Sequence, residues 1–222
     1  VNLHVENGDT LLHAAVYYND PELLTFLLKN GANVNAQSFK DKGTPLHYAA
    51  YLGNCKMAEI LIEYGADINY RKESMYTPLH MASLYSKKEM VKLLLAHGAK
   101  VNAKNNMDGT PLYDACVSGV TLGEDEESVE TVRILLENGA DPSIQGHPDY
   151  TIIQMTLVMG NFETAKLLAQ YGATLESENG SEKIILRGEE LEQYIEQYKD
   201  YYEENKEKIQ EIETKNLGTA TH

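Results

Sequence analysis

The chain has 222 residues, a formal net charge of −15 at pH 7, 42% hydrophobic residues and no tryptophan. This composition predicts a soluble globular protein of one or two domains and excludes disorder throughout. The negative charge disfavours nucleic acid and the anionic face of a membrane as partners, and no apolar run approaches the ~20 residues that a spanning helix needs.

A four-residue pattern recurs along the chain at nearly constant spacing. It reads Thr-Leu-Leu-His at 10–13 and Thr-Pro-Leu-His at 44–47 and 77–80, then weakens to Thr-Pro-Leu-Tyr at 110–113 and Thr-Ile-Ile-Gln at 151–154. A second marker, Gly-Ala, follows the threonine by 21 residues in each of the first three units. Two markers in constant phase indicate an internal repeat of about 33 residues.

Each unit is predicted to contain two short helices followed by an extended turn. In the second unit Pro45 occupies the first helical turn, where its missing N–H is not needed. A break at Gly53-Asn54 leads to a second helix with apolar residues spaced by three and four. Gly65 then closes this helix as a left-handed cap, and an extended segment leads to the next threonine.

This unit resembles the ankyrin repeat. The segments that carry the resemblance are TPLHYAAYLGN (44–54), ILIEYGADIN (60–69), TPLHMAS (77–83), LLLAHGAKVN (93–102) and ILLENGADPS (134–143). The resemblance implies an all-α solenoid of stacked helix-turn-helix units with β-hairpin-like loops. It also implies a curved stack that binds proteins on its concave side.

The repeat phase divides the chain into segments. Residues 1–7 are interpreted as the tail of a preceding repeat, so we expect the natural protein to extend upstream; a degenerate N-terminal cap is the alternative. The five repeats are assigned to 8–40, 41–73, 74–106, 107–147 and 148–180. Residues 181–222 are assigned to a C-terminal capping helix and a disordered tail.

Two segments depart from the repeat. The fourth unit is longer, and the excess falls at 120–127, whose sequence VTLGEDEE predicts a solvated acidic insertion and lacks the ligand alternation of a calcium loop. Residues 189–212 predict one long helix, followed by disorder from 216 to 222. A helix that covers the last repeat is favoured, because a terminal repeat needs a polar outer face. A dimerising coiled coil and a detached tail are the alternatives.

No enzyme motif is present in the sequence, which has no phosphate-binding glycine loop, nucleophile elbow or HExxH helix. His13, His47 and His80 occupy one position of successive units, so we expect their rings about 10 Å apart, too far to share a metal. Each imidazole is expected to bond a neighbouring turn. Cys55 and Cys116 are interpreted as inert buried thiols. We therefore predict a non-enzymatic chain without catalytic residues, cofactor or metal.

The resemblance places variable, partner-binding residues at the end of each first helix and in the loops between units. At the helix ends these residues are Tyr17, Tyr18, Tyr51, Leu52, Leu84 and Tyr85, and in the loops they are Phe39, Lys40, Lys42, Tyr70, Arg71, Tyr76, Lys104 and Met107. Tyrosines of this kind are typical interface anchors. The alternative is that some of them only pack between units.

The leading hypothesis is a protein-interaction module that binds a partner protein or peptide, with an acidic or amphipathic segment, on the concave face. The alternative is a targeting or substrate-recruiting domain of a larger enzyme, channel or exported bacterial effector. We expect a cytoplasmic monomer. A dimer through the C-terminal helix, and a secreted bacterial effector acting in the host cytosol, are the alternatives.

Overall fold

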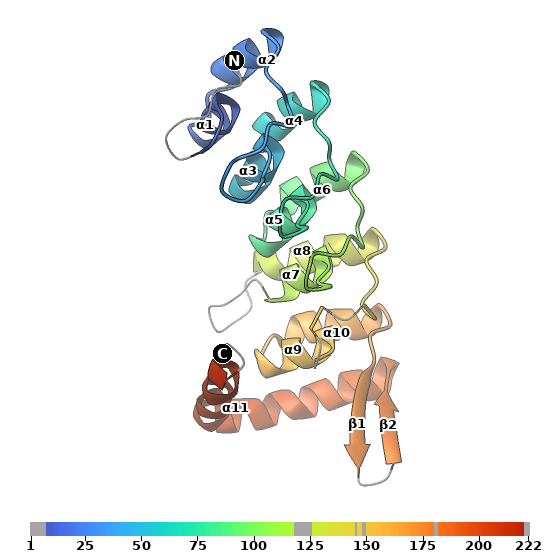
Figure 1. The fold of residues 1–222 in the computed structure, drawn as a ribbon. Coiled ribbons are helices and arrows are strands. Elements are labelled where there is room, and N and C mark those ends of the chain that lie inside the picture. The colour runs from blue at the N-terminus through green and yellow to red at the C-terminus, as the bar shows by residue number, and fades with distance from the viewer. Residues whose placement is uncertain (1–7, 118–125, 145, 148–149, 180–181, 220–222) are drawn as a thin grey trace.

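The computed structural model describes residues 8–117, 126–144, 146–147, 150–179 and 182–219. Within these ranges, ten short helices pair into five units that stack in one direction (Figure 1). The pairs are α1 (Leu11–Tyr17) with α2 (Pro21–Lys29), α3 (Pro45–Leu52) with α4 (Cys55–Glu63), α5 (Pro78–Leu84) with α6 (Lys88–Ala96), α7 (Pro111–Val117) with α8 (Glu126–Glu137), and α9 (Ile152–Val158) with α10 (Phe162–Gln170). The predicted all-α solenoid is confirmed.

The repeat threonine starts the first helix of a unit. Thr44 has an extended backbone, and Pro45 follows at the first helical position. The Thr44 N–H donates to His47 Nδ1 over 3.2 Å, and the same capping box occurs at Thr10 and Thr77. The Thr-Pro-Leu-His quartet is therefore a helix start, in which the histidine satisfies the backbone N–H of the cap residue.

Asparagines join successive units at the outer end of the second helices. The side-chain oxygens of Asn35, Asn69 and Asn102 accept from the backbone N–H of the residue that follows the next Gly-Ala pair, at 2.8, 2.8 and 2.9 Å. This bond gives a physical role to the Val-Asn and Ile-Asn pairs of the repeat, because each one ties its unit to the next.

The hydrophobic core is continuous along the stack. The residue two places after each repeat threonine is fully buried, and in chain order these residues are Leu12, Leu46, Leu79, Leu112 and Ile153. Burying one such side chain stabilises the fold by about 1.5–3 kcal/mol. Each unit therefore contributes the same inward-facing residue to a shared core and depends on its neighbours to cover it.

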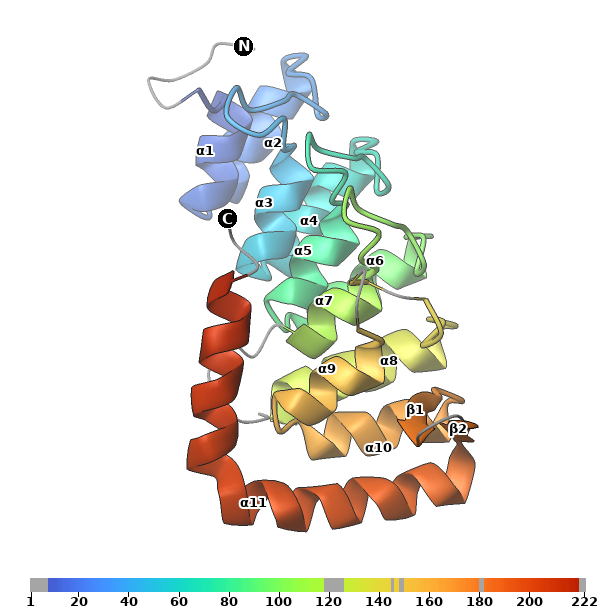
Figure 2. The ribbon, with the colours of Figure 1, turned by 60° about the horizontal axis from the view of Figure 1, so that its bottom comes forward.

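The C-terminal end differs from the other units. An antiparallel hairpin of β1 (Leu175–Asn179) and β2 (Glu182–Leu186) follows α10, with Leu175 opposite Leu186. The long helix α11 (Gly188–Thr219) then packs on α10. Figure 2 shows that α11 first runs along the end of the stack and then turns, so that its last part extends beside the stack. The sequence had not predicted this hairpin.

Two boundaries differ from the sequence-based expectation. α11 continues to Thr219, past the expected end at 212 and into residues expected to be disordered. Glu126 and Glu127, assigned to the acidic insertion, form the first turn of α8, where the helix dipole stabilises carboxylates. The remainder of that insertion, within 118–125, and the proposed repeat tail at 1–7 lie outside the described residues.

Candidate functional site

The ends of the first helices carry exposed tyrosines in the first three units. Tyr18 is 78% exposed, and Tyr51 and Tyr85 are 41% and 44% exposed. Tyr51 and Tyr85 lie in successive units with ring centroids 4.5 Å apart in an edge-to-face arrangement. Tyr17 and Tyr18 form a second such pair at 5.3 Å. The stack therefore places aromatic edges along one side of its first three units.

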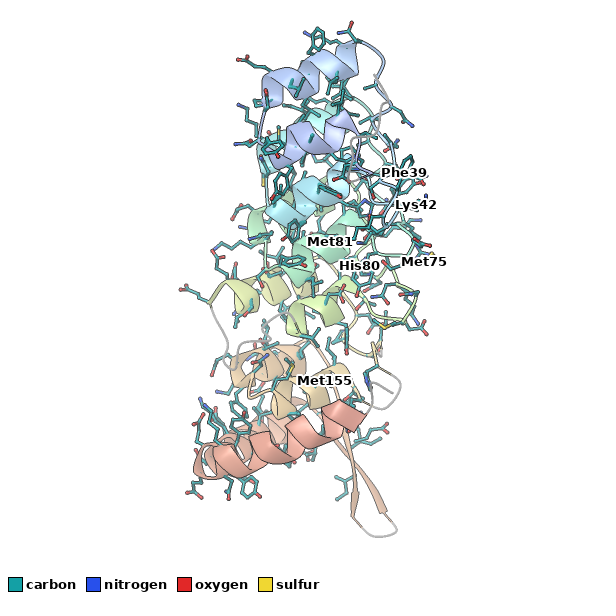
Figure 3. The ribbon with its side chains drawn as sticks, turned by 60° about the vertical axis from the view of Figure 1, so that its left-hand side comes forward. Phe39, Lys42, Met75, His80, Met81 and Met155 are labelled. Atoms are coloured by element: carbon teal, nitrogen blue, oxygen red, sulfur yellow. The ribbon has the colours of Figure 1, made fainter. Side chains whose placement is uncertain are left out.

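The loops between units provide a second set of exposed groups. We call residues 37–43, 70–76 and 104–109 the finger loops. Phe39 is exposed, and Lys42 Nζ lies 5.9 Å from the centroid of its ring. In the third finger loop, Met107 is 65% exposed. Figure 3 shows Phe39, Lys42 and Met75 together on the finger-loop side, whereas Met81 lies on α5. The exposed side chains of the loops thus combine apolar groups with cations.

Several predicted binding residues are engaged between neighbouring loops. Gln37 Nε2 donates to the hydroxyl of Tyr70, and Arg71 Nη2 donates to the backbone oxygen of Lys104 over 3.0 Å. The half-buried Tyr76 packs its ring 5.3 Å from that of His80. Tyr70 and Arg71 therefore tie units together, and Tyr76 packs within its own unit, as the alternative interpretation expected of some tyrosines.

The remaining predicted residues divide by exposure. Lys40, Leu52 and Lys104 are exposed, and Leu84 is half-buried. The prediction omitted Met75, which is exposed and adopts a left-handed backbone with φ of 64°. Its place two residues before Thr77 matches that of Lys42 before Thr44, and this register is the signal that identifies it.

An ion pair joins the first two finger loops. Lys72 Nζ lies 2.8 Å from Asp41, whose carboxylate also accepts from the Ser38 hydroxyl and the Gly43 N–H. Partial burial alone would raise the pKa of Asp41, but these bonds outweigh it and hold the pKa well below its usual value. Asp41 stays ionised and orders its loop, so the loop presents a fixed surface.

The repeat histidines connect each unit to the next, as expected. His13, His47 and His80 Nε2 lie 3.1, 3.0 and 3.2 Å from backbone oxygens in the following finger loop. Since Nδ1 accepts from the cap N–H, Nε2 carries the proton and donates. Burial lowers the pKa of His47 and His80 to about 4, so both imidazoles are neutral at pH 7. These rings therefore join the backbone of one unit to that of the next.

The described residues contain no group of three or more His, Cys, Asp or Glu side chains that could hold a metal ion. Cys116 is buried, whereas Cys55 is only half-buried, contrary to the expectation of two buried thiols. Burial and the nearby Glu59 and Glu89 raise the pKa of Cys55, which makes its thiolate scarce at neutral pH. No helix among the described residues combines the length and apolar character of a membrane span.

The fourth unit contains a buried carboxyl that sequence reasoning missed. Tyr113 occupies the histidine position, and Asp114 beside it is 2% exposed. Within the described part of the chain, Asp114 Oδ2 has no hydrogen-bond partner. Burial raises the pKa of Asp114 to about 8. Met81 and Met155 hold the equivalent place in neighbouring units, so an apolar residue fits this site.

The fold and this surface define a helical repeat protein of the solenoid class. A family model described as "Ankyrin repeats (3 copies)" matches residues 1–72 and 71–146. The chain belongs to the ankyrin repeat family, as the quartets predicted. It is also 38% identical over 60 residues to an ankyrin repeat protein of Acanthamoeba polyphaga mimivirus, and this match covers 27% of the chain and 37% of the relative.

Proposed function

We propose that the chain binds a partner protein or peptide on the concave side of its first three units, without enzymatic activity of its own. Ankyrin repeats are generally protein–protein interaction modules and are typically non-enzymatic. The observation that carries the proposal is the edge-to-face contact of Tyr51 and Tyr85 across two units, with both rings still exposed. Partly ordered aromatic rings of this kind lose little conformational freedom when a partner covers them.

The finger loops favour an acidic or amphipathic partner. They carry five Lys and Arg residues against three Asp and Glu residues, in a chain whose formal net charge is −15. Lys40 and Lys42 are exposed, whereas Lys72 is engaged with Asp41. Apolar anchors beside exposed cations match a segment that alternates apolar and acidic residues.

The test is affinity capture with the full chain, followed by quantitative mass spectrometry and measurement of affinity for the captured partner. The variant combines Tyr51→Ala with Tyr85→Ala. Loss of such anchors weakens binding by at least about thirtyfold, equivalent to about 2 kcal/mol. Tyr64→Ala is the matched control, because Tyr64 is 38% exposed but lies at the end of an outer helix of the second unit.

Equal capture by the double variant and the Tyr64→Ala control would contradict the assignment of the concave surface. Thermal melting of all three proteins shows whether the fold is kept. Light scattering after gel filtration tests the accompanying proposal that the module is a monomer.

A further inference from the structure

The fifth unit retains one half of the histidine connection. Gln154 occupies the histidine position, and its Oε1 accepts from the Thr151 N–H and hydroxyl at 2.8 and 3.1 Å. In the fifth unit this oxygen therefore accepts the cap hydrogen bonds that the histidine Nδ1 accepts in units one to three. In units one to three, the other ring nitrogen donates to a backbone carbonyl of the following finger loop. Among the described residues, the Nε2 amide of Gln154 has no such acceptor.

The segment that follows the fifth unit explains the difference. After α10 the chain forms the β1–β2 hairpin, whose backbone groups pair with each other, and then enters α11. A recess of about 260 Å³ lies between α9, β1 and α11, and Gln154 forms part of its wall. Figure 1 shows the hairpin and α11 next to the last unit. The recess beside the Gln154 amide lies between them and α9.

We propose that this recess is a second peptide-binding site, which takes an extended, basic segment of a partner protein. A backbone carbonyl of that segment accepts from Gln154 Nε2, and one apolar side chain enters the recess. The bound segment occupies the place that a following finger loop holds in the first three units.

The lining of the recess fits such a segment. Leu157, Val158 and Leu175 provide an apolar floor. Tyr194 and Tyr198 of α11 stack at 6.1 Å and form an aromatic wall. The volume lies below the about 300–1,000 Å³ of small-molecule pockets and suits one side chain of a peptide.

The negative charge of α11, which borders the recess, determines the charge that we expect of the bound peptide segment. Residues 188–206 of α11 carry seven Asp and Glu residues and two lysines. A segment with Lys or Arg on both sides of its apolar residue therefore gains attraction, and an acidic segment is repelled. The site prefers the opposite charge from the finger-loop surface of the first three units.

The experiment selects a phage-displayed library of random twelve-residue peptides on the full chain and measures affinities of the enriched synthetic peptides. Gln154→Glu keeps an oxygen for the Thr151 cap but removes the amide donor. Val158→Tyr fills the recess with the residue that Tyr51 provides at the equivalent position of the second unit. We expect enriched peptides with Lys or Arg around one apolar residue, and at least a tenfold loss of affinity with either variant.

The Gln154→Glu result is specific because the new carboxylate should strengthen any purely electrostatic attraction to a basic peptide. The control, Tyr51→Ala combined with Tyr85→Ala, should bind these peptides normally, which separates this site from the concave surface. Thermal melting confirms that each variant is folded. Failure to enrich any basic peptide, loss of the basic peptides in the Tyr51→Ala and Tyr85→Ala control, or equal binding of them by Gln154→Glu would overturn the proposal.

Discussion

The first three units and the C-terminal end of the molecule are joined to their neighbours by different contacts. In units one to three, one buried histidine both caps its own helix and donates to the next loop. In unit four Tyr113 replaces this histidine, and in unit five Gln154 keeps only the cap. The connection between units can therefore be reduced where other contacts hold the stack.

At the C-terminal end, α11 supplies those contacts. Leu191, Ile195 and Tyr202 are buried on the last repeat. The ring of Tyr202 lies over Gly160, where an added Cβ would come within 3.0 Å of it and the backbone has φ of 76°. Histidine hydrogen bonds thus connect the early units, whereas apolar burial under a long helix closes the last one.

The largest expected effect follows from removing apolar contact at the C-terminal end. Ile195→Ala should destabilise the protein by about 2–5 kcal/mol, because the residue is fully buried between α11 and α10. Ile185→Ala is the matched control; its side chain is exposed on β2, so a change within about 0.5 kcal/mol is expected. Urea unfolding followed by circular dichroism measures both. Similar losses would mean that α11 does not close the stack.

The next effect tests the histidine connection. His47→Ala should cost about 2–4 kcal/mol, because it leaves the Thr44 N–H and the Tyr76 carbonyl without partners in a buried setting. Gln154→Ala should cost only about 1 kcal/mol, since it removes a cap alone. Equal losses in urea unfolding would show that the bond to the next loop contributes nothing.

Acid should weaken the first units through the same histidines. The folded-state pKa of His47 and His80 is about 4, below the usual 6.5, so the unfolded chain binds protons first as the pH falls. Stability is fully present above pH 6.5 and is lost between about 6.5 and 4, by on the order of 3 kcal/mol for each histidine. His47→Gln keeps a cap acceptor and should flatten this part of the pH profile of unfolding free energy. An unchanged slope would refute the assignment.

The fourth unit should show the opposite pH dependence. The folded-state pKa of Asp114 is about 8, above the usual 3.8, so its contribution is fully present below pH 3.8 and is lost as the pH rises toward 8. Asp114→Asn should therefore gain stability relative to the parent at pH 8, by about 1–3 kcal/mol, and little at pH 4. Chemical unfolding at both pH values tests this. A gain that is independent of pH would contradict the burial of an ionisable carboxyl.

The smallest expected effect concerns the ion pairs between α10 and α11. Lys166 contacts Glu196 of α11 and lies 3.2 Å from Glu163 of its own helix. Lys166→Met should change the unfolding free energy by at most about 1 kcal/mol, because both carboxylate partners of the lysine are exposed to solvent. The difference from the parent should shrink in 1 M salt. A salt-independent loss would indicate that the packing of the lysine stem matters more than its charge.

The sequence predicted where several residues of the candidate site lie in the repeat. The repeat phase placed Tyr51 and Tyr85 at equivalent helix ends, and the structure brings these rings into contact. The phase did not distinguish exposed anchors from side chains such as Tyr70 and Arg71, which bond to a neighbouring loop. Whether such a side chain is exposed or bonded depends on a partner residue about one repeat away in the sequence.

By itself, the sequence determined the repeat unit, its helix starts and the role of the histidines. These features depend on hydrogen bonds between residues three apart and on apolar spacing within one helix. Only the tertiary structure decided, among the described residues, that Asp114 Oδ2 is buried without a hydrogen-bond partner and that Gln154 Nε2 has no acceptor. It also decided between the alternatives for the C-terminal helix, because α11 packs on the last unit. The reason is physical: burial and the supply of hydrogen-bond acceptors are properties of the space between units, and that space exists only after the stack has formed.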